Sequence, residues 1–579
     1  MHLGNRYSQH SFAQIPDVTI PRSQFDRSYT IKDTFDFDYL VPIHVDEVIP
    51  GDTHNLTINC FARLATQIVP IMDNMYIDFF FFFVPNRLVW TNWEKFNGAQ
   101  DNPGDSTSYV CPTLTVGAAF TVGSIFDKMG LPTDVANVAV SNTLPLRAYI
   151  KIYNDWFRDE NLQNSVTLPT GNGPDVQASF ALQKRGKRHD YLTSALPWPQ
   201  KGTAVSLPLG ITAPVWGSAS SLPTAITDNK SPIFSAFLDR TTDGAMQAMQ
   251  SINFTSAATT TPAAAPLSAG GNIFQTMSWN TGTFAGAGDA VANANSQMVY
   301  LNETLSKAKN ASAQAPWYAD LATATAATVN QLRLAIMVQS LLELDARGGT
   351  RYVEILRAHF GVISPDFRLQ RAEFLGGGTI RINSHPVAQT AITSGANALG
   401  QLAAFSTASA SDRNNIGFTK SFVEHGYIIG LACGRADLTY QQGLNRMWSK
   451  STRYDFFWPK LQQLGEQTIL NKEIYTNPAG GQDDNVFGYQ ERYAEYRYKP
   501  SEIHGEFRST YATSIDQWHL AEEFSALPVL NSTFIVQNTP VDRAIAVTTA
   551  PHLLLDVFYN LKSARPMMTY SVPATLGRF

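Results

Sequence analysis

Apolar and polar residues alternate near both ends of the chain. Phe35, Phe37 and Tyr39 fall on one face of a predicted strand, and Asp36 and Asp38 fall on the other. The same two-residue period returns early and late in the chain, at Leu56, Ile58 and Cys60 and at Leu553, Leu555, Val557 and Tyr559. Because no helical pattern separates the early strands, the sequence predicts a mainly β, antiparallel fold in which one β core carries large loops.

Five consecutive phenylalanines, Phe79–Phe83, break this alternation. A strand with one solvated face alternates apolar and polar residues, whereas this run is apolar on both sides, so both sides must be covered. The run lies between Asp78 and Pro85, far short of the roughly 20 residues that span a bilayer, and membrane insertion is not expected. Two interpretations stay open. The strand is buried within its own fold, or it packs one side on its own core and the other on a neighbouring chain.

Three segments change to a helical period. In 146–164, Tyr149, Ile152, Tyr153 and Trp156 follow the i, i+3, i+4, i+7 spacing of an amphipathic helix. A second helix is predicted over 320–347, with Leu332, Ile336 and Leu341 apolar and Gly348-Gly349 placed to end it. A third is predicted over Arg351–Phe360, before Pro365.

The composition of the 579-residue chain indicates extensive contact with partners. Only 16% of residues are charged, against roughly 25% in ordinary soluble domains, which leaves little charge to coat a free surface. The net charge of −5 means that the chain alone neutralises little phosphate. Cys60, Cys111 and Cys433 have no disulfide or zinc spacing, and Met1–Ser8 has no apolar segment of a secretion signal. These features favour folding in a reducing cytosol.

The region of about 205–318 differs from the rest in composition. No charged residue occurs from Gly244 to Gly288, and 255–270 reads TSAATTTPAAAPLSAG. Such small residues cannot fill a core of their own. A disordered linker and an ordered surface protrusion are both compatible with this composition, and we favour the protrusion.

No catalytic, nucleotide-binding or metal-binding motif is present, and no cofactor is expected. Gly376-Gly377-Gly378 is interpreted as a flexible turn before a strand at Thr379–Ile382. Nothing in the sequence therefore points to an enzyme.

Two basic clusters are candidate contacts for DNA or for another subunit. The first contains Lys184, Arg185, Lys187 and Arg188, whose alternative role is a solvated loop or an ion-paired interface. In the second, cations interleave with tyrosines, a combination that can stack bases and hold the backbone of a single strand. Its candidates are Arg492, Tyr493, Arg497 and Lys499, although Glu491 and Glu495 argue for pairing within the chain.

Long segments of this sequence resemble the major capsid proteins of gokushoviruses, a branch of the Microviridae. The resemblance runs almost end to end and includes FFFFFVPNRLVWTNWEKFNG at 79–98, RAYIKIYNDWFRDENLQ at 147–163, KRHDYLTSALPWPQKG at 187–202, SPDFRLQRAEFLGGG at 364–378, the segments 418–456 and 490–508, and RPMMTYSVPATLGRF at 565–579. The region of about 205–318 matches poorly.

The resemblance implies a viral jelly roll, an eight-stranded antiparallel β-sandwich with long inserted loops and a few helices. Residues 1–204 and 319–579 would form this core as one discontinuous domain, and 205–318 would form a protrusion at the three-fold axes. The candidate host-contact residues in that insertion are Thr259, Thr260, Thr261, Pro262 and Ala264.

The family also implies a function. Sixty copies would assemble in the host bacterial cytoplasm into a T=1 icosahedral virion around circular single-stranded DNA. The implied partners are further copies of the chain, the DNA genome, a small basic DNA-packaging protein, an internal scaffolding protein and a host surface receptor. The alternative is a secreted adhesin or lectin-like β protein, which would need a secretion signal.

Overall fold

A computed structural model provides the structure of the chain. It describes residues 21–203, 205, 215–217, 237–240, 246–248, 299–300, 317–319, 329–347, 358–359, 370–388, 402–411 and 415–570. The chain forms two compact units, in each of which the residues contact one another more than they contact the other unit. One unit consists of 1–202 and 341–579 and the other of 203–340. Each unit is described by itself.

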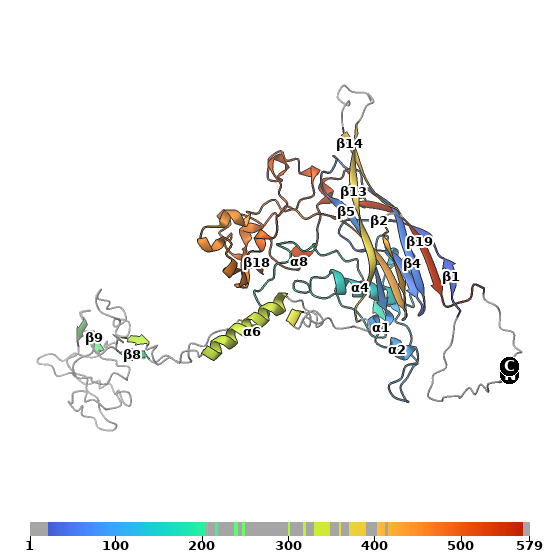
Figure 1. The fold of residues 1–579 in the computed structure, drawn as a ribbon, viewed down its shortest axis with the longest axis horizontal. Coiled ribbons are helices and arrows are strands. Elements are labelled where there is room, and N and C mark those ends of the chain that lie inside the picture. The colour runs from blue at the N-terminus through green and yellow to red at the C-terminus, as the bar shows by residue number, and fades with distance from the viewer. Residues whose placement is uncertain are drawn as a thin grey trace, which may run out of the picture. The chain divides into compact units, whose positions relative to one another are not determined.

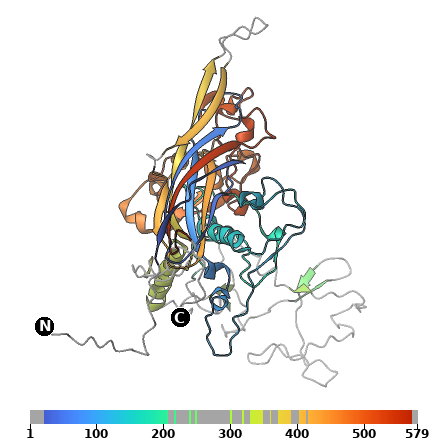
Figure 2. The same cartoon turned by 90° about the vertical axis from the view of Figure 1, so that its right-hand side faces the viewer.

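The first unit is built around one curled antiparallel sheet of ten strands (Figures 1 and 2). Along the sheet the order is β1, β19, β4, β14, β13, β5, β16, β3, with β2 also paired to β19 and β15 to β4. The strands are β1 (Ser23–Asp26), β2 (Tyr29–Phe35), β3 (Val41–Val48), β4 (Thr53–Leu64), β5 (Met75–Pro85), β13 (Glu373–Ala388), β14 (Leu402–Ala410), β15 (Gly417–Ser421), β16 (Gly426–Ala436) and β19 (Leu553–Arg565).

The sheet folds over so that its two halves enclose one core. Side chains of β4 and β19 in one half, such as Ile58 and Val557, and of β5 and β16 in the other, such as Phe81 and Ile428, belong to the same buried cluster. The Tyr559 hydroxyl donates across the core to the carbonyl of Ile43 at 2.6 Å. The predicted mainly β jelly-roll fold is confirmed, with the two facing sheets joined along β13 and β14.

The outer face of the β5–β16 half is covered by helical segments. The cover comes from α1 (Asn86–Val89), α2 (Trp93–Phe96), α3 (Ile125–Lys128), α4 (Leu144–Ile152) and a π-helical turn (Tyr153–Phe157). Tyr149, Ile152 and Tyr153 are buried there, as the helical period predicted, whereas Trp156 is 39% exposed. The helical segment ends at Phe157, so the predicted extension to 164 is wrong. Two short strands, β6 (Leu114–Thr115) and β7 (Asp175–Val176), pair in parallel among these segments.

A third buried cluster supports a lobe beside the sheet. It includes Leu192, Ile469, Phe487 and Phe534, and its regular elements are the hairpin β17 (Glu466–Leu470) and β18 (Val486–Glu491) and the short helix α8 (Ser532–Ile535). β18 and α8 are labelled in Figure 1. Most of the remaining chain in this lobe forms turns and single 3₁₀ turns.

Helix α6 (Val329–Arg347) confirms the second predicted helix over its described part and ends just before Gly348-Gly349, whereas 320–328 lie outside the described residues. Its residues Leu332, Ile336 and Leu341 are exposed. The third predicted helix lies outside the described residues except for Ala358 and His359. In the second unit, β9 (Phe237–Arg240) pairs with β10 (Met246–Ala248) and β11 (Val299–Tyr300), and β8 (Val215–Gly217) pairs with β12 (Trp317–Ala319).

The alternating segment at 35–39 is not one strand. β2 ends at Phe35, and Asp38 has a left-handed backbone with φ of 70°. Its carboxylate is buried rather than solvated, because it accepts hydrogen bonds from the backbone and hydroxyl of Thr539. The prediction placed Asp38 on a solvated face, and this was wrong because the left-handed turn directs its side chain inward. A two-residue period cannot reveal such a turn.

The glycine triplet is also not a turn. Gly376, Gly377 and Gly378 lie within β13 and pair with Phe81, Phe80 and Phe79 of β5. A Cβ atom on Gly377 would stand 2.1 Å from the Phe79 carbonyl oxygen, and one on Gly376 would stand 2.4 Å from that of Gly417. Glycine is needed here because neighbouring backbones approach closely.

The phenylalanine run is divided between two cores of the same chain. Phe79, Phe81 and Phe83 point into the core enclosed by the sheet, whereas Phe82 and the partly buried Phe80 point into the cluster under the helical cover. Both faces are therefore covered without a neighbouring chain.

Candidate assembly and DNA-contact surfaces

The first basic cluster lies on an extended segment that is fixed along its backbone. Lys184 forms a β-bridge with Tyr39, and Gly186 forms one with Val536. A Cβ atom on Gly186 would approach the carbonyl oxygen of Phe157 to 3.1 Å. The backbone of this segment is therefore fixed, and its four cationic side chains point toward different surroundings.

Arg185 points inward to Asp78, which lies at the start of the phenylalanine run. The Asp78 carboxylate accepts from Arg185 at 2.5 Å and from Arg435 at 2.8 Å, and it also accepts from the Thr379 hydroxyl. Burial raises the pKa of Asp78, but these hydrogen bonds outweigh it and hold the pKa below its usual value. The Arg185 guanidinium also lies 5.4 Å from the Phe80 ring centroid.

Lys187 is likewise used within the chain. Its ammonium lies 2.6 Å from the Glu522 carboxylate and 4.3 Å from the Phe534 ring centroid. Burial raises the pKa of Glu522, and the Lys187 charge counteracts the rise. Arg185 and Lys187 are thus components of internal ion pairs.

The two other cations of this segment, Lys184 and Arg188, form no ion pair with a described residue. Lys184 donates to the side chain of Asn538 at 3.0 Å and lies over the Tyr39 ring. Arg188 is exposed and makes no ion pair with a described residue. Of the four, Arg188 is the most accessible to a phosphate.

The second basic cluster is also largely paired within the chain. Arg492 donates to the Tyr454 carbonyl at 2.8 Å, and Arg497 forms an ion pair with Glu491. Tyr493 is buried, with φ of 63°, and its hydroxyl donates to the Phe456 carbonyl at 2.9 Å. Lys499 is exposed and has no ion pair with a described residue. Arg492 and Tyr493 therefore support the neighbouring loop 447–458, whereas Arg497 pairs with Glu491.

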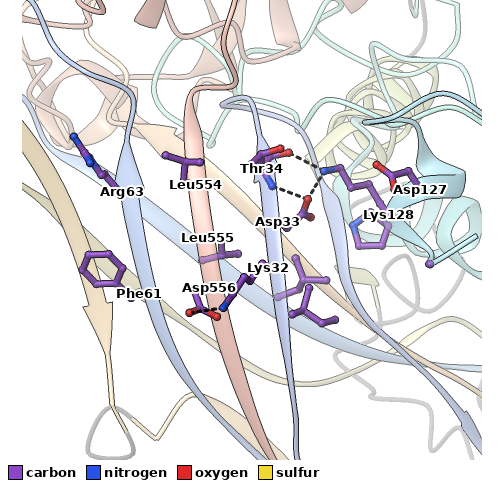
Figure 3. A pocket seen from close by; sticks show the side chains of 14 residues that line it. Lys32, Asp33, Thr34, Phe61, Arg63, Asp127, Lys128, Leu554, Leu555 and Asp556 are labelled. Carbon is purple, nitrogen blue, oxygen red and sulfur yellow. Dashed lines mark hydrogen bonds and ion pairs between the residues drawn. The ribbon is translucent and has the colours of Figure 1, made fainter. Parts of the chain in front are cut away.

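A pocket of about 670 Å³ is lined by strands of both halves of the sheet (Figure 3). Its walls come from β2, β3, β4, β19 and the end of α3. Lys128 forms an ion pair with Asp33 and donates to the Thr34 carbonyl at 2.7 Å, and Lys32 pairs with Asp556 at 3.1 Å. The apolar part of the lining includes Ile31, Pro42, Ile43, Phe61, Leu554 and Leu555.

No group of histidine, cysteine or acidic residues suited to a metal ion occurs in the part of the chain that the structure describes. Cys60, Cys111 and Cys433 are all free. Within the described ranges, none of the helices combines the length and apolarity needed to cross a membrane. The candidate host-contact residues Thr259, Thr260, Thr261, Pro262 and Ala264 lie outside the described residues.

Comparison with known proteins gives matches over nearly the whole chain. The family described as "Capsid protein (F protein)" matches residues 13–575. Capsid protein VP1 of Bdellovibrio phage phiMH2K is 52% identical over 582 residues, which is 100% of both chains. Capsid protein VP1 of Chlamydia phage 1 is 42% identical, and that of Spiroplasma virus 4 is 33% identical, each with 97% of both chains covered.

The chain belongs to the phage F capsid protein family. The resemblance to gokushovirus-type Microviridae capsid proteins is thereby confirmed. As a capsid protein it is a component of the virion and associates with other copies of itself, and the matched relatives are structural proteins.

Sequence reasoning missed one surface of this capsid protein. Exposed aromatic side chains gather on the loop 447–458, which the second basic cluster supports. The signal was present as Tyr454-Asp-Phe-Phe-Trp458, four aromatics in five residues. Because the segment has no strand or helix period, no pattern indicated whether these rings are buried.

Proposed function

We propose that this chain is the major capsid protein of a phage, sixty copies of which form a T=1 icosahedral shell around a circular single-stranded DNA genome. The observation that carries the proposal is the match to capsid proteins over both full lengths, together with a jelly-roll fold within one unit. Assembly takes place in the host bacterial cytoplasm.

The mechanism is assembly rather than turnover. Each copy presents complementary surfaces to its neighbours, as closed symmetry requires. Individual contacts can be weak because many act together in a closed shell. The net charge of −5 supports a division of labour in which a small basic packaging protein neutralises the DNA, and an internal scaffolding protein assists assembly.

The proposed DNA-contact residues are Arg188 and Lys499, both exposed and without an ion pair to a described residue. Lysine and arginine bind phosphate and release counterions, so each lost cation weakens DNA retention in a salt-dependent way. Arg185 and Lys187 have lower priority because their charges are already neutralised by Asp78 and Glu522.

We expect the double variant Arg188→Ala/Lys499→Ala to form shells with less packaged DNA, especially at higher salt. The measurement is the ratio of absorbance at 260 and 280 nm in purified particles. Arg63→Ala is a matched control, because Arg63 is exposed at the pocket and makes no ion pair with a described residue. An unchanged DNA content in the double variant would remove these two residues from the DNA-contact surface.

The proposed role of the region 205–318 is a protrusion at the three-fold axes that contacts a host surface receptor. Support comes from its composition, which lacks charge over Gly244–Gly288. It also comes from its place in the sequence, between the two chain segments that form the first unit. Thr259, Thr260, Thr261, Pro262 and Ala264 remain the candidate contact residues.

The direct test of the shell is expression of the chain, alone and with its scaffolding protein, followed by negative-stain microscopy. We expect closed particles of uniform size. Particles purified from infected cells should in addition protect single-stranded DNA from nuclease. A strictly monomeric product under both conditions would contradict the proposal.

A further inference from the structure

Five aromatic side chains form an exposed surface, here called the aromatic surface: Tyr454, Phe456, Phe457, Trp458 and Tyr496. Tyr454 is 64% exposed, Phe456 53% and Tyr496 52%. The rings lie on two 3₁₀ turns, Arg453–Asp455 and Ala494–Tyr496, and on the chain that follows the first. Trp448, on the preceding turn Arg446–Ser449, is 72% exposed.

Ring and cation contacts hold Phe456, Phe457 and Tyr496 in the aromatic surface. The Phe457 ring packs edge-on against Tyr496 at 6.1 Å and against buried Tyr493 at 5.2 Å. The Lys450 ammonium lies 3.8 Å from the Tyr496 centroid and 5.8 Å from that of Phe456. The loop is thus supported from below while its outer ring faces remain open to solvent.

The cations under the aromatic surface are already neutralised. Lys450 lies 3.5 Å from Glu495, and the Arg446 guanidinium lies 2.8 Å from Glu473. A single-stranded DNA site needs free positive charge for phosphate beside its stacking rings. The pairing of Lys450 and Arg446 within the chain leaves fewer free cations for phosphate beside the rings, which favours a protein partner.

Two further cations, Arg453 and Lys460, have no carboxylate partner among the described residues. Arg453 lies 4.5 Å over the Trp458 ring. Tyrosine, tryptophan and arginine are the residue types enriched in the energetically dominant centres of protein interfaces. A carboxylate on the facing protein would complete the Arg453–Trp458 pair.

The size of the aromatic surface also fits an interface. At the observed exposures, the five rings present on the order of 500 Å² of surface, since a fully exposed aromatic side chain has about 150–250 Å². The largest apolar patch on a monomer is usually about 300–600 Å² and is often functional, and a stable interface buries about 800 Å² per partner. The surface is large enough to be the centre of such an interface.

We propose that the aromatic surface is covered by a second copy of this chain in the assembled shell. The proposal rests on the proposed capsid function, because only self-assembly supplies a facing copy. It assigns the second basic cluster a supporting role: Arg492 and Tyr493 hold the carbonyls of Tyr454 and Phe456, and so position the rings for the neighbour.

Hydroxyl-radical footprinting of the unaltered protein tests the assignment directly. Oxidation of Tyr454, Phe456 and Trp458 is compared in unassembled subunits, in shells without DNA and in DNA-filled shells. We expect about tenfold less oxidation in both kinds of shell, because the centre of an interface is desolvated. Equal oxidation in subunits and empty shells would overturn the proposal, and protection only in filled shells would assign the surface to DNA.

A variant provides an independent test. Tyr454→Ser/Phe456→Ser should raise the protein concentration needed for shell formation by about tenfold or more, since lost aromatic anchors weaken every repeated contact. Tyr511→Ser is the control, because Tyr511 is 48% exposed outside this surface. Circular dichroism and melting of the subunits verify folding.

The outcomes of this variant separate the two hypotheses. Shells at the normal concentration from a folded double variant would overturn the interface. A failure of the unaltered protein to form shells would instead contradict the proposed function, and it would be seen before any variant is made. If the double variant does not fold, footprinting of the unaltered protein decides.

Discussion

At the scale of single residues, the charges that looked alike in the sequence have different roles in the structure. Arg185 and Lys187 each form an ion pair with a carboxylate of the same chain, whereas Arg188, on the same extended segment, is exposed to solvent. Sequence spacing could not separate them, because their partners Asp78 and Glu522 are distant along the chain. Replacing all three at once would mix a loss of DNA contact with a loss of folding.

We expect Lys187→Ala to lower the free energy of unfolding by about 3 kcal/mol, because it leaves the Glu522 carboxylate buried without its cation. Arg185→Ala should cost less, about 1–3 kcal/mol, because Arg435 still bonds to Asp78. The measurement is urea denaturation of unassembled subunits.

Arg188→Ala is the matched control and should change stability by less than about 0.5 kcal/mol, as exposed substitutions usually do. Equal stability of Lys187→Ala and Arg188→Ala would show that the Lys187–Glu522 pair contributes nothing to folding.

At the scale of elements, the phenylalanine strand β5 is covered on both faces by its own chain. Its odd-numbered phenylalanines enter the core enclosed by the sheet, and Phe82 enters the core under α4. The other half of the sheet differs, because the outward residues Phe61, Leu554 and Phe558 of β4 and β19 are exposed. The contrast explains why β5 is continuously apolar while β19 alternates.

We expect Phe81→Ala and Phe82→Ala each to destabilise unassembled subunits by about 3–5 kcal/mol, because each leaves a cavity in a different buried cluster. Thermal melting and urea denaturation measure the change. Phe61→Ala, at a site that is 53% exposed, is the control and should be nearly neutral.

One result would instead support the interpretation that a neighbouring chain covers one face of β5. If Phe82→Ala left the subunits fully stable and weakened only the shell, then its ring would be stabilised by another copy rather than by α4.

Elements with a clear period were predictable, and elements defined by distant contacts were not. The strands at 56–60 and 553–559 follow from period alone, and the structure confirms them. The helix predicted over 146–164 is confirmed only as far as Phe157, where the π-helical turn after α4 ends. The sequence around Gly376–Gly378 is typical of a turn, but these residues lie inside β13. Glycine is necessary there because the backbones of β5 and β15 approach β13 closely. The DNA-contact residues remain a prediction, and the aromatic surface needed the packing around Tyr493 to become visible.

At the scale of the whole molecule, the ten-stranded sheet is built entirely from residues outside 203–340. Strands β1–β5 precede that region, and β13–β16 and β19 follow it. Among the described residues, the strand pairs of this sheet thus involve no residue of 203–340.

We expect deletion of about residues 250–275 to leave subunit folding intact while weakening particle stability or infection. The reason is that all ten strands of the sheet lie in the first unit, whereas this range belongs to the second unit, 203–340. Subunit melting, particle melting and plaque counts measure the three effects separately. A deletion that removed β15 (Gly417–Ser421), which pairs with β4, is the control expected to prevent folding. Loss of soluble expression in the 250–275 deletion would place that range in the core instead.

The position of β19 sets the time at which the sheet can form during synthesis. This strand is the last of the sheet to leave the ribosome, yet it lies between β4 on one side and β1 and β2 on the other. The first strands made therefore wait unpaired on that edge for more than 500 residues of translation, since Lys32 pairs with Asp556 at a separation of 524. Such long-range pairing is slow to form and exposes strand edges in the meantime. A nascent chain cut short before β19 leaves β1, β2 and β4 without this partner strand, so we expect interrupted translation products to be excluded from the shell.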